Sequence, residues 1–196
     1  MELSYSPNGA ITVTVEQYIR RVCSEVGVAH MEDCTLPSGR DLFHSSKNCT
    51  PVDVKYYQRL SGYIIHAIKV RHDVRKECVH LSTKRVSPDE SDLSKLIQVF
   101  RYLHTTADIA LTFYTDEGVI LCAYVDASFG VHSNGSSHTG GYCCIGRTNT
   151  PIWTYSAPQV DVALAPMQGE YYGLSDIAKR VLFFFTISYG YWVPTE

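Results

Sequence analysis

The sequence predicts an α+β fold in two pieces: a mainly helical first piece, and a second piece in which a β-meander precedes one long helix. Apolar residues recur at helical spacing in several stretches before Leu103. After Leu103 the pattern changes to short apolar runs separated by turns rich in glycine, serine and asparagine, which is typical of antiparallel strands. Helical spacing returns from about Met167. These three observations define the fold class.

Size and composition limit the classes of protein that the chain can represent. Its 196 residues, 45% of them hydrophobic, suit one compact domain or two small ones and exclude a disordered polymer. A net charge of −3 means that a nucleic-acid partner would have to bind a local basic patch. The apolar run from Val181 to Ile187 is too short to span a bilayer, and Met1 to Ala10 lacks signal-peptide features, so we expect an intracellular protein with no membrane partner. Seven cysteines without a C-x-x-C pair argue against a zinc framework or a disulfide scaffold.

The first elements are a hairpin and a helix. Asn8-Gly9 between apolar runs predicts a tight turn that leads into a strand at 10–13. Thr14 and Gln17 have the spacing of a capping box for the helix that follows. Its apolar residues are Val15, Tyr18, Ile19, Val22 and Val26, and the polar stretch 32–48 that comes next is predicted to be a loop.

Three further helices are predicted in the middle of the chain. Thr50 can cap the first of them, with Pro51 in its first turn. A shorter helix covers Asp73 to Ser82, and Ser87-Pro88-Asp89-Glu90 starts the third. The predicted buried faces consist of Val54, Tyr57, Ser61, Ile64 and Ile68 in the first helix and Leu93, Leu96, Ile97, Phe100 and Leu103 in the third.

Strands then occupy the chain up to the final helix. They are predicted at 109–114, 119–125, 140–146 and 152–155, with a turn at 115–118. The final helix begins at about Met167, and its predicted buried side consists of Tyr171, Leu174, Ala178, Val181, Leu182 and Phe185.

Two carboxylates are candidates for catalytic chemistry. Asp126 ends an apolar strand run and Glu170 opens the last helix. Carboxylates on a strand end and a neighbouring helix can hold divalent ions for phosphodiester cleavage, and hard oxygen ligands suit magnesium. The alternative is structural, because an aspartate after a strand is commonly a turn former and a glutamate at a helix start commonly complements the helix dipole.

Several motifs, in one order along the chain, resemble those of copia-type LTR retrotransposon Pol polyproteins. Tyr124 to Gly130 resembles the D-A-D-W-A-type motif that opens the ribonuclease H domain of that family. The other segments that carry the resemblance are Tyr57 to Ile65, Arg71 to Val74, Arg101 to Asp108, Thr139 to Tyr142, Ile152 to Gln159 and Gln168 to Tyr171. The beginning of the chain resembles the region that leaves the reverse-transcriptase palm, so the resemblance covers nearly the whole chain.

The resemblance implies a domain order and a function. Residues 1–50 would be the end of the palm and the start of the thumb, 51–116 the helical thumb and connection, and 117–196 an incomplete ribonuclease H-like domain with a mixed sheet and one long helix. The implied activity is magnesium-dependent cleavage of RNA in RNA–DNA hybrids, with Asp126 and Glu170 as catalytic residues and metal ligands. The implied partners are the hybrid or another nucleic acid and the rest of a Pol polyprotein, in the cytoplasm, in virus-like particles or in the nucleus.

Departures from the family pattern lead us to expect impaired cleavage. The family uses a third aspartate on a later strand, and this sequence ends at Glu196 without it. Two carboxylates are too few to neutralise and position two magnesium ions. A non-catalytic nucleic-acid-binding or interaction remnant, or a decayed relic, is therefore the alternative. Without the last strands, the strand that carries Asp126 would lie at an open edge, so we expect marginal stability or aggregation unless a partner chain completes the fold.

Basic residues around the middle helices are the candidate nucleic-acid contacts. Lys69, Arg71, Arg75 and Lys76 could bind phosphates. A solvated helix face explains the same pattern, since acidic residues are interspersed.

Overall fold

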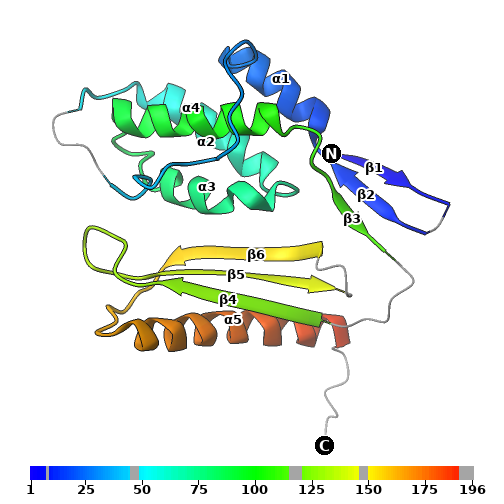
Figure 1. The fold of residues 1–196 in the computed structure, drawn as a ribbon, viewed down its shortest axis with the longest axis vertical. Coiled ribbons are helices and arrows are strands. Elements are labelled where there is room, and N and C mark those ends of the chain that lie inside the picture. Colours follow the sequence, from blue (N-terminus) through cyan, green and yellow to red (C-terminus); the bar gives the residue numbers. More distant parts are fainter. Residues whose placement is uncertain (8, 45–48, 115–120, 146–149, 190–196) are drawn as a thin grey trace, which may run out of the picture. The chain divides into compact units, whose positions relative to one another are not determined.

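The computed structural model describes residues 1–196 except 8, 45–48, 115–120, 146–149 and 190–196 (Figure 1). The chain divides into two compact units, Met1–Gly118 and Val119–Glu196. Each unit combines helix with a three-stranded antiparallel sheet, which confirms the α+β class. The assignment of three reverse-transcriptase and ribonuclease H segments stays a prediction.

The sheet of the first unit contains the predicted hairpin. Strands β1 (Glu2–Tyr5) and β2 (Ile11–Thr14) pair antiparallel, and β3 (Leu111–Phe113) pairs with β2, which gives the order β1-β2-β3. Gly9 has a φ of 82°, a left-handed conformation that glycine adopts without strain. Asn8, the other residue of the predicted turn, lies outside the described residues, as does the predicted turn at 115–118.

Four α-helices and a 3₁₀ turn complete the described part of the first unit. They are α1 (Glu16–Val26), α2 (Val54–Ala67), the 3₁₀ turn η1 (His72–Val74), α3 (Arg75–Ser82) and α4 (Glu90–Thr105). The predicted core faces are largely confirmed, because Tyr57, Ser61, Ile64, Leu96, Phe100 and Leu103 are all buried. Val54 is the exception: it lies at the start of α2 and is exposed.

The predicted helix caps are wrong by a few residues. Helix α1 begins after Val15 with no side-chain cap, and Thr14 Oγ1 accepts from the backbone N–H of Glu16. Asp53, not Thr50, caps α2, and Asp89, not Ser87, caps α4 in a reciprocal capping box with Asp92. Asp53 and Asp89 are the caps because the chain just before each of them is extended, and these two extended segments pair with each other.

That pairing joins the starts of α2 and α4. Pro51 and Asp89 form an isolated antiparallel bridge. The N–H of Val52 donates to the Pro88 carbonyl, and the N–H of Glu90 donates to the Thr50 carbonyl, each over 3.0 Å. The prolines therefore lie in extended backbone before each helix and not in its first turn.

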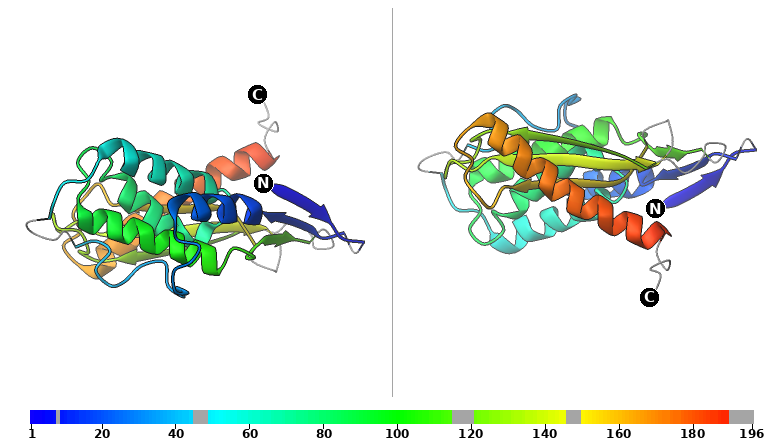
Figure 2. Two further views of the ribbon diagram at one scale, coloured as in Figure 1. Left: turned by 90° about the horizontal axis from the view of Figure 1, so that it is seen from above. Right: turned by 90° about the horizontal axis from the view of Figure 1, so that it is seen from below.

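The second unit is a three-stranded sheet with one helix on one face. Its strands β4 (Leu121–Ser128), β5 (His138–Ile145) and β6 (Thr150–Pro158) are antiparallel in the order β4-β5-β6. Helix α5 (Pro166–Tyr189) packs against β4 and β5, and Figure 2 shows it running along the sheet. Among the described strands, β4, which carries Asp126, lies at an edge as predicted; the parallel pairing of a mixed sheet is not among the described pairs.

Glycines bring α5 close to the sheet. A Cβ at position 141 in β5 would lie 2.6 Å from Cδ1 of Ile177 and 2.8 Å from the carbonyl oxygen of Tyr124. In α5, Gly173 faces Val125 and Thr139, and Ile177 is 2% exposed. The buried face of α5 is therefore the one that contains Gly173 and Ile177.

This finding corrects the predicted buried side of α5. Tyr171, Leu174 and Leu182 are 62%, 54% and 65% exposed. The apolar pattern indicated a face with large side chains, but the sheet packs against the face that contains Gly169, Gly173 and Ile177, where Gly141 leaves room for the Ile177 side chain. The side chain of Phe185 lies outside the described part of the chain.

Within the described residues, no helix combines the length and apolar content that crossing a lipid bilayer requires.

We expect Gly141→Ala to destabilise the second unit by roughly 1–3 kcal/mol, because the new methyl group would overlap a backbone oxygen that cannot rotate away. Hydrogen exchange of the β5 amides measures the effect. Gly173→Ala is the matched control: its Cβ would lie 3.4 Å from Cγ2 of Val125, an ordinary contact, and alanine favours the helix by about 1 kcal/mol. Equal exchange rates for the two variants would contradict the close approach at position 141.

Cysteine reactivity provides a second prediction. Burial raises the pKa of Cys23 to about 12 and that of Cys78 to about 11, and it also raises the pKa values of Cys143 and Cys144. The thiolate is the reactive form, so these four buried cysteines should resist iodoacetamide in the folded protein.

Mass spectrometry of the labelled protein, with and without denaturant, reads out each site. We expect Cys34, Cys49 and Cys122, which are only partly buried, to react first. If Cys23 is labelled as fast as Cys49 in the absence of denaturant, the hydrophobic core of the first unit is not formed.

Candidate functional site

Asp126 lies near the end of β4 and is exposed to solvent. Its neighbour Val125 faces α5, since Cγ2 of Val125 lies against Gly173 of that helix. Successive side chains of a strand point to opposite faces. The Asp126 carboxylate therefore projects from the sheet face that α5 does not cover, where it lies opposite Gly140 of β5.

Glu170 lies in the first turn of α5 and is also exposed. Gly169, one residue earlier, is buried against Ser137 and Gln159, and a helix turns by about 100° per residue. Glu170 therefore lies on a flank of α5, whereas Asp126 leaves the opposite face of the sheet. The structure does not bring the two predicted site residues together, and within the described residues no group of three His, Cys, Asp or Glu side chains could hold a metal ion.

Gln159 fixes the start of α5 on the sheet. Its side chain is 5% exposed, and Nε2 donates to Oγ1 of Thr139 over 3.0 Å and to the Gly169 carbonyl over 2.7 Å. Gln159 closes the Ile152 to Gln159 motif, so this part of the resemblance has a structural role: it holds the backbone next to Glu170.

A chain of hydrogen bonds lies on the same sheet face as Asp126. Nε2 of His132 is 2.9 Å from Nδ1 of His138, and Nε2 of His138 is 2.7 Å from Oγ of Ser156. His138 is buried, and burial lowers the pKa of His132. This chain, which was not predicted, links the segment before β5 to β6.

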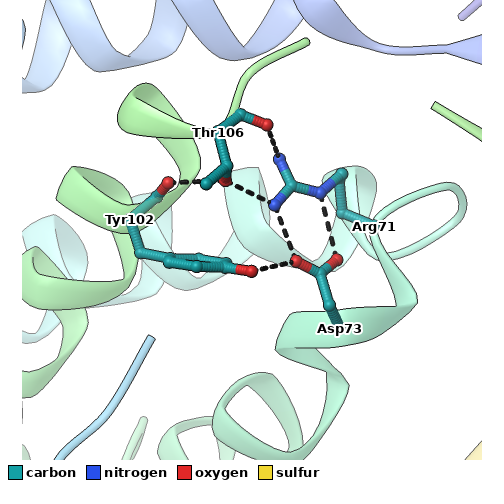
Figure 3. A network of polar contacts seen from close by, with 4 residues as sticks. All are labelled: Arg71, Asp73, Tyr102 and Thr106. Carbon is teal, nitrogen blue, oxygen red and sulfur yellow. Dashed lines mark hydrogen bonds and ion pairs between the residues drawn. The ribbon is translucent and has the colours of Figure 1, made fainter. Parts of the chain in front are cut away.

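Arg71, a predicted nucleic-acid contact, is instead part of the core of the first unit (Figure 3). Its side chain is 0% exposed and donates to both carboxylate oxygens of Asp73, over 3.0 and 2.6 Å. It also donates to the carbonyl and to Oγ1 of Thr106, each over 2.7 Å, and the Tyr102 hydroxyl donates to Asp73 over 2.8 Å. The guanidinium is therefore committed to internal partners, and the prediction that it binds phosphate is wrong.

The chain has a detectable relative among curated proteins. A protein of Saccharomyces cerevisiae named "Putative transposon Ty5-1 protein" is 24% identical over 188 residues. The match takes in 92% of this chain and 59% of the yeast protein, so the chain spans about three fifths of its relative's length. Over most of its length the chain is similar to a transposon protein. No protein family model and no solved structure matches it.

The transposon similarity extends over both units, because a match of 188 residues exceeds the length of either.

The other predicted phosphate contacts lie in the first unit. Lys69 and Lys76 are exposed, with Nζ of Lys76 at 3.6 Å from the Glu77 carboxylate, and Arg75 is partly buried. For these three residues nucleic-acid contact stays a prediction.

One cationic cluster was missed by the sequence analysis. The guanidinium carbon of Arg180 in α5 lies 4.3 Å from the ring centroid of Tyr155 and 5.6 Å from that of Trp153. Trp153 and Tyr155 are two residues apart on one strand, which places both on one face, and Lys179-Arg180 is the only basic pair in α5. The sequence contained both features, the aromatic spacing in the strand and the basic pair in the helix. It did not indicate that α5 packs on the sheet face that carries Trp153 and Tyr155.

We expect Asp73→Asn to lower the free energy of unfolding by about 2 kcal/mol, because it leaves the buried Arg71 without its counter-charge. Burial tends to raise the pKa of Asp73, but hydrogen bonds and charge from Arg71 outweigh it, so the pKa lies below its ordinary value. The stabilisation is thus present above about pH 4 and is lost as the pH falls through the lowered pKa.

Urea unfolding at neutral pH and in acid measures this prediction, with the exposed Asp108→Asn as control. The wild type should lose stability on acidification and approach the Asp73→Asn variant. A constant difference between them at every pH would contradict the assigned ion pair.

Proposed function

We propose that the chain derives from a copia-type LTR retrotransposon Pol polyprotein and that it binds RNA–DNA hybrids or related nucleic acids with impaired cleavage. The observation that carries this proposal is the similarity to a transposon protein over 92% of the chain. A second observation supports it: three antiparallel strands followed by one long helix, with Asp126 on the first strand, is the order that the resemblance implies for the start of a ribonuclease H domain.

The geometry favours binding over cleavage. Two-metal hydrolysis needs several carboxylates that converge on one point. Asp126 and Glu170 do not converge, so as placed they do not fit a pair of magnesium ions. Asp126 can still accept a hydrogen bond from a nucleic-acid hydroxyl or contact a single hydrated cation, because it is exposed on an edge strand.

Magnesium-dependent cleavage is the second candidate function. It is favoured by the position of Asp126 inside the Tyr124 to Gly130 motif and of Glu170 inside the Gln168 to Tyr171 motif. The rest of a Pol polyprotein would supply the missing carboxylate in that case. A location in the cytoplasm, in virus-like particles or in the nucleus belongs to the same proposal.

A labelled RNA–DNA hybrid distinguishes the two candidates. We expect salt-sensitive binding by fluorescence anisotropy, because phosphate contacts release counterions, and no strand cleavage when magnesium is added. Asp126→Asn and Glu170→Gln are the test variants and Asp108→Asn is the control.

Two results of this experiment would contradict the proposal, each in a different part. Cleavage that is lost in both test variants and kept in the control would establish the nuclease and overturn the proposal of impaired cleavage. Absence of binding at low salt, by a protein shown to be folded, would overturn the nucleic-acid proposal itself.

A further inference from the structure

The second unit contains a groove between α5 and β6 that the proposed function does not use. A cavity of about 300 Å³ is lined by Trp153, Asp176, Lys179, Arg180 and Phe183. A neighbouring cavity of about 260 Å³ shares Asp176 and Lys179 with it and adds Asp161, Tyr172 and Ser175 to the lining. We call these two cavities together the α5–β6 groove. Its first cavity has the volume of a small ligand site.

One end of the groove is aromatic and cationic. The rings of Trp153 and Tyr155 stack with centroids 5.9 Å apart and planes 16° from parallel. The Arg180 guanidinium lies over both rings, and Lys179 and Phe183 are exposed beside it. Nucleic-acid bases stack on aromatic rings and on guanidinium planes, and phosphates pair with exposed Arg and Lys side chains.

The other end of the groove offers hydrogen-bond acceptors and hydroxyl groups. Asp176 lies between the two cavities, and Asp161, Tyr172 and Ser175 line the second. A carboxylate next to bound phosphate repels further negative charge and accepts hydrogen bonds from ribose hydroxyls. The groove therefore offers a stacking surface, two cations and hydrogen-bond acceptors along one side of α5.

We propose that the α5–β6 groove binds one nucleotide unit of single-stranded RNA. The base stacks at Trp153 and Phe183, the phosphate pairs with Lys179 and Arg180, and the 2′-hydroxyl donates to Asp176. Single-stranded RNA fits better than duplex because a paired base cannot leave its stack to enter a cavity of this size.

An acidic peptide fits the groove less well. Its carboxylates would pair with Lys179 and Arg180, but it offers no planar ring system for the stacked Trp153, Tyr155 and Arg180 and no hydroxyl donor for Asp176. A purely structural role for Arg180 would need only the ring contact and gives no reason for Lys179 and Asp176 to line the same cavity. The groove uses neither Asp126 nor Glu170, so its test is independent of hybrid cleavage.

Fluorescence of Trp153 provides the direct readout. In a Trp192→Phe background Trp153 is the single tryptophan of the chain. We expect oligo(rU) to quench its emission and oligo(dU) to bind more weakly, because oligo(dU) lacks the 2′-hydroxyl that pairs with Asp176. The double variant Lys179→Ala/Arg180→Ala should bind oligo(rU) roughly tenfold more weakly and show a shallower dependence on salt.

The controls separate this site from other surfaces. Arg59→Ala is the matched control, because Arg59 is an exposed arginine 5.4 Å from the centroid of the Tyr56 ring in the first unit, and it should leave oligo(rU) binding unchanged. Trp153→Tyr keeps a stacking ring, so it should retain binding measured by anisotropy, and circular dichroism shows that each variant is folded.

Each remaining outcome has a defined meaning. Equal affinity for oligo(rU) and oligo(dU) would overturn the ribose contact at Asp176. Unchanged binding by the Lys179/Arg180 double variant, or equal quenching by poly-glutamate, would overturn the site. Loss of oligo(rU) binding in that variant while it still binds the RNA–DNA hybrid would support the groove and leave the proposed function intact.

Discussion

The second unit depends on the fit of Ile177 of α5 over Gly141 of β5, where a single methyl group would overlap the Ile177 side chain and the Tyr124 carbonyl oxygen of β4. Because Ile177 occupies the space above Gly141, the face of α5 that contains Gly169, Gly173 and Ile177 lies against the sheet. The remaining faces of α5 are thereby fixed: Glu170 lies on a flank, and Lys179 and Arg180 reach the β6 side. The same packing turns Val125 inward and Asp126 outward. One steric constraint thus decides which chemistry each surface of this unit can offer.

The first unit depends on a charge that is buried and neutralised within the chain. Arg71 joins η1 to the end of α4, since its guanidinium donates four hydrogen bonds: two to the Asp73 carboxylate, one to the Thr106 carbonyl and one to the Thr106 hydroxyl. Burying an arginine raises the free energy of the folded state unless its charge is paired and its N–H groups are hydrogen-bonded. The segment around η1 therefore has little freedom to adopt another arrangement. The Arg71 to Val74 motif is accordingly a feature of the fold and not of a ligand surface.

The fold was predictable from the sequence to the extent that local patterns determine it. The Gly9 turn, the core positions of α2 and α4 and the antiparallel strands after Leu103 follow from periodicity and turn chemistry. The predictions failed where long-range packing overrides a local signal. Pro51 and Pro88 favour helix starts, yet both lie in extended segments that pair with each other. The large apolar residues of α5 are exposed because the helix face that contains Ile177 fits over Gly141 instead. The orientation of Asp126 depends on strand alternation relative to a helix some forty residues away, which the sequence does not specify.

The bridge between Pro51 and Asp89 closes the intervening chain into a loop whose two ends are held by backbone hydrogen bonds. Helices α2 and α3 lie within this loop, and their buried residues pack into the core of the first unit together with α1 and α4. Because the loop ends and the core hold both helices, local opening of the first unit should involve α2 and α3 together and not proceed by fraying of individual helices.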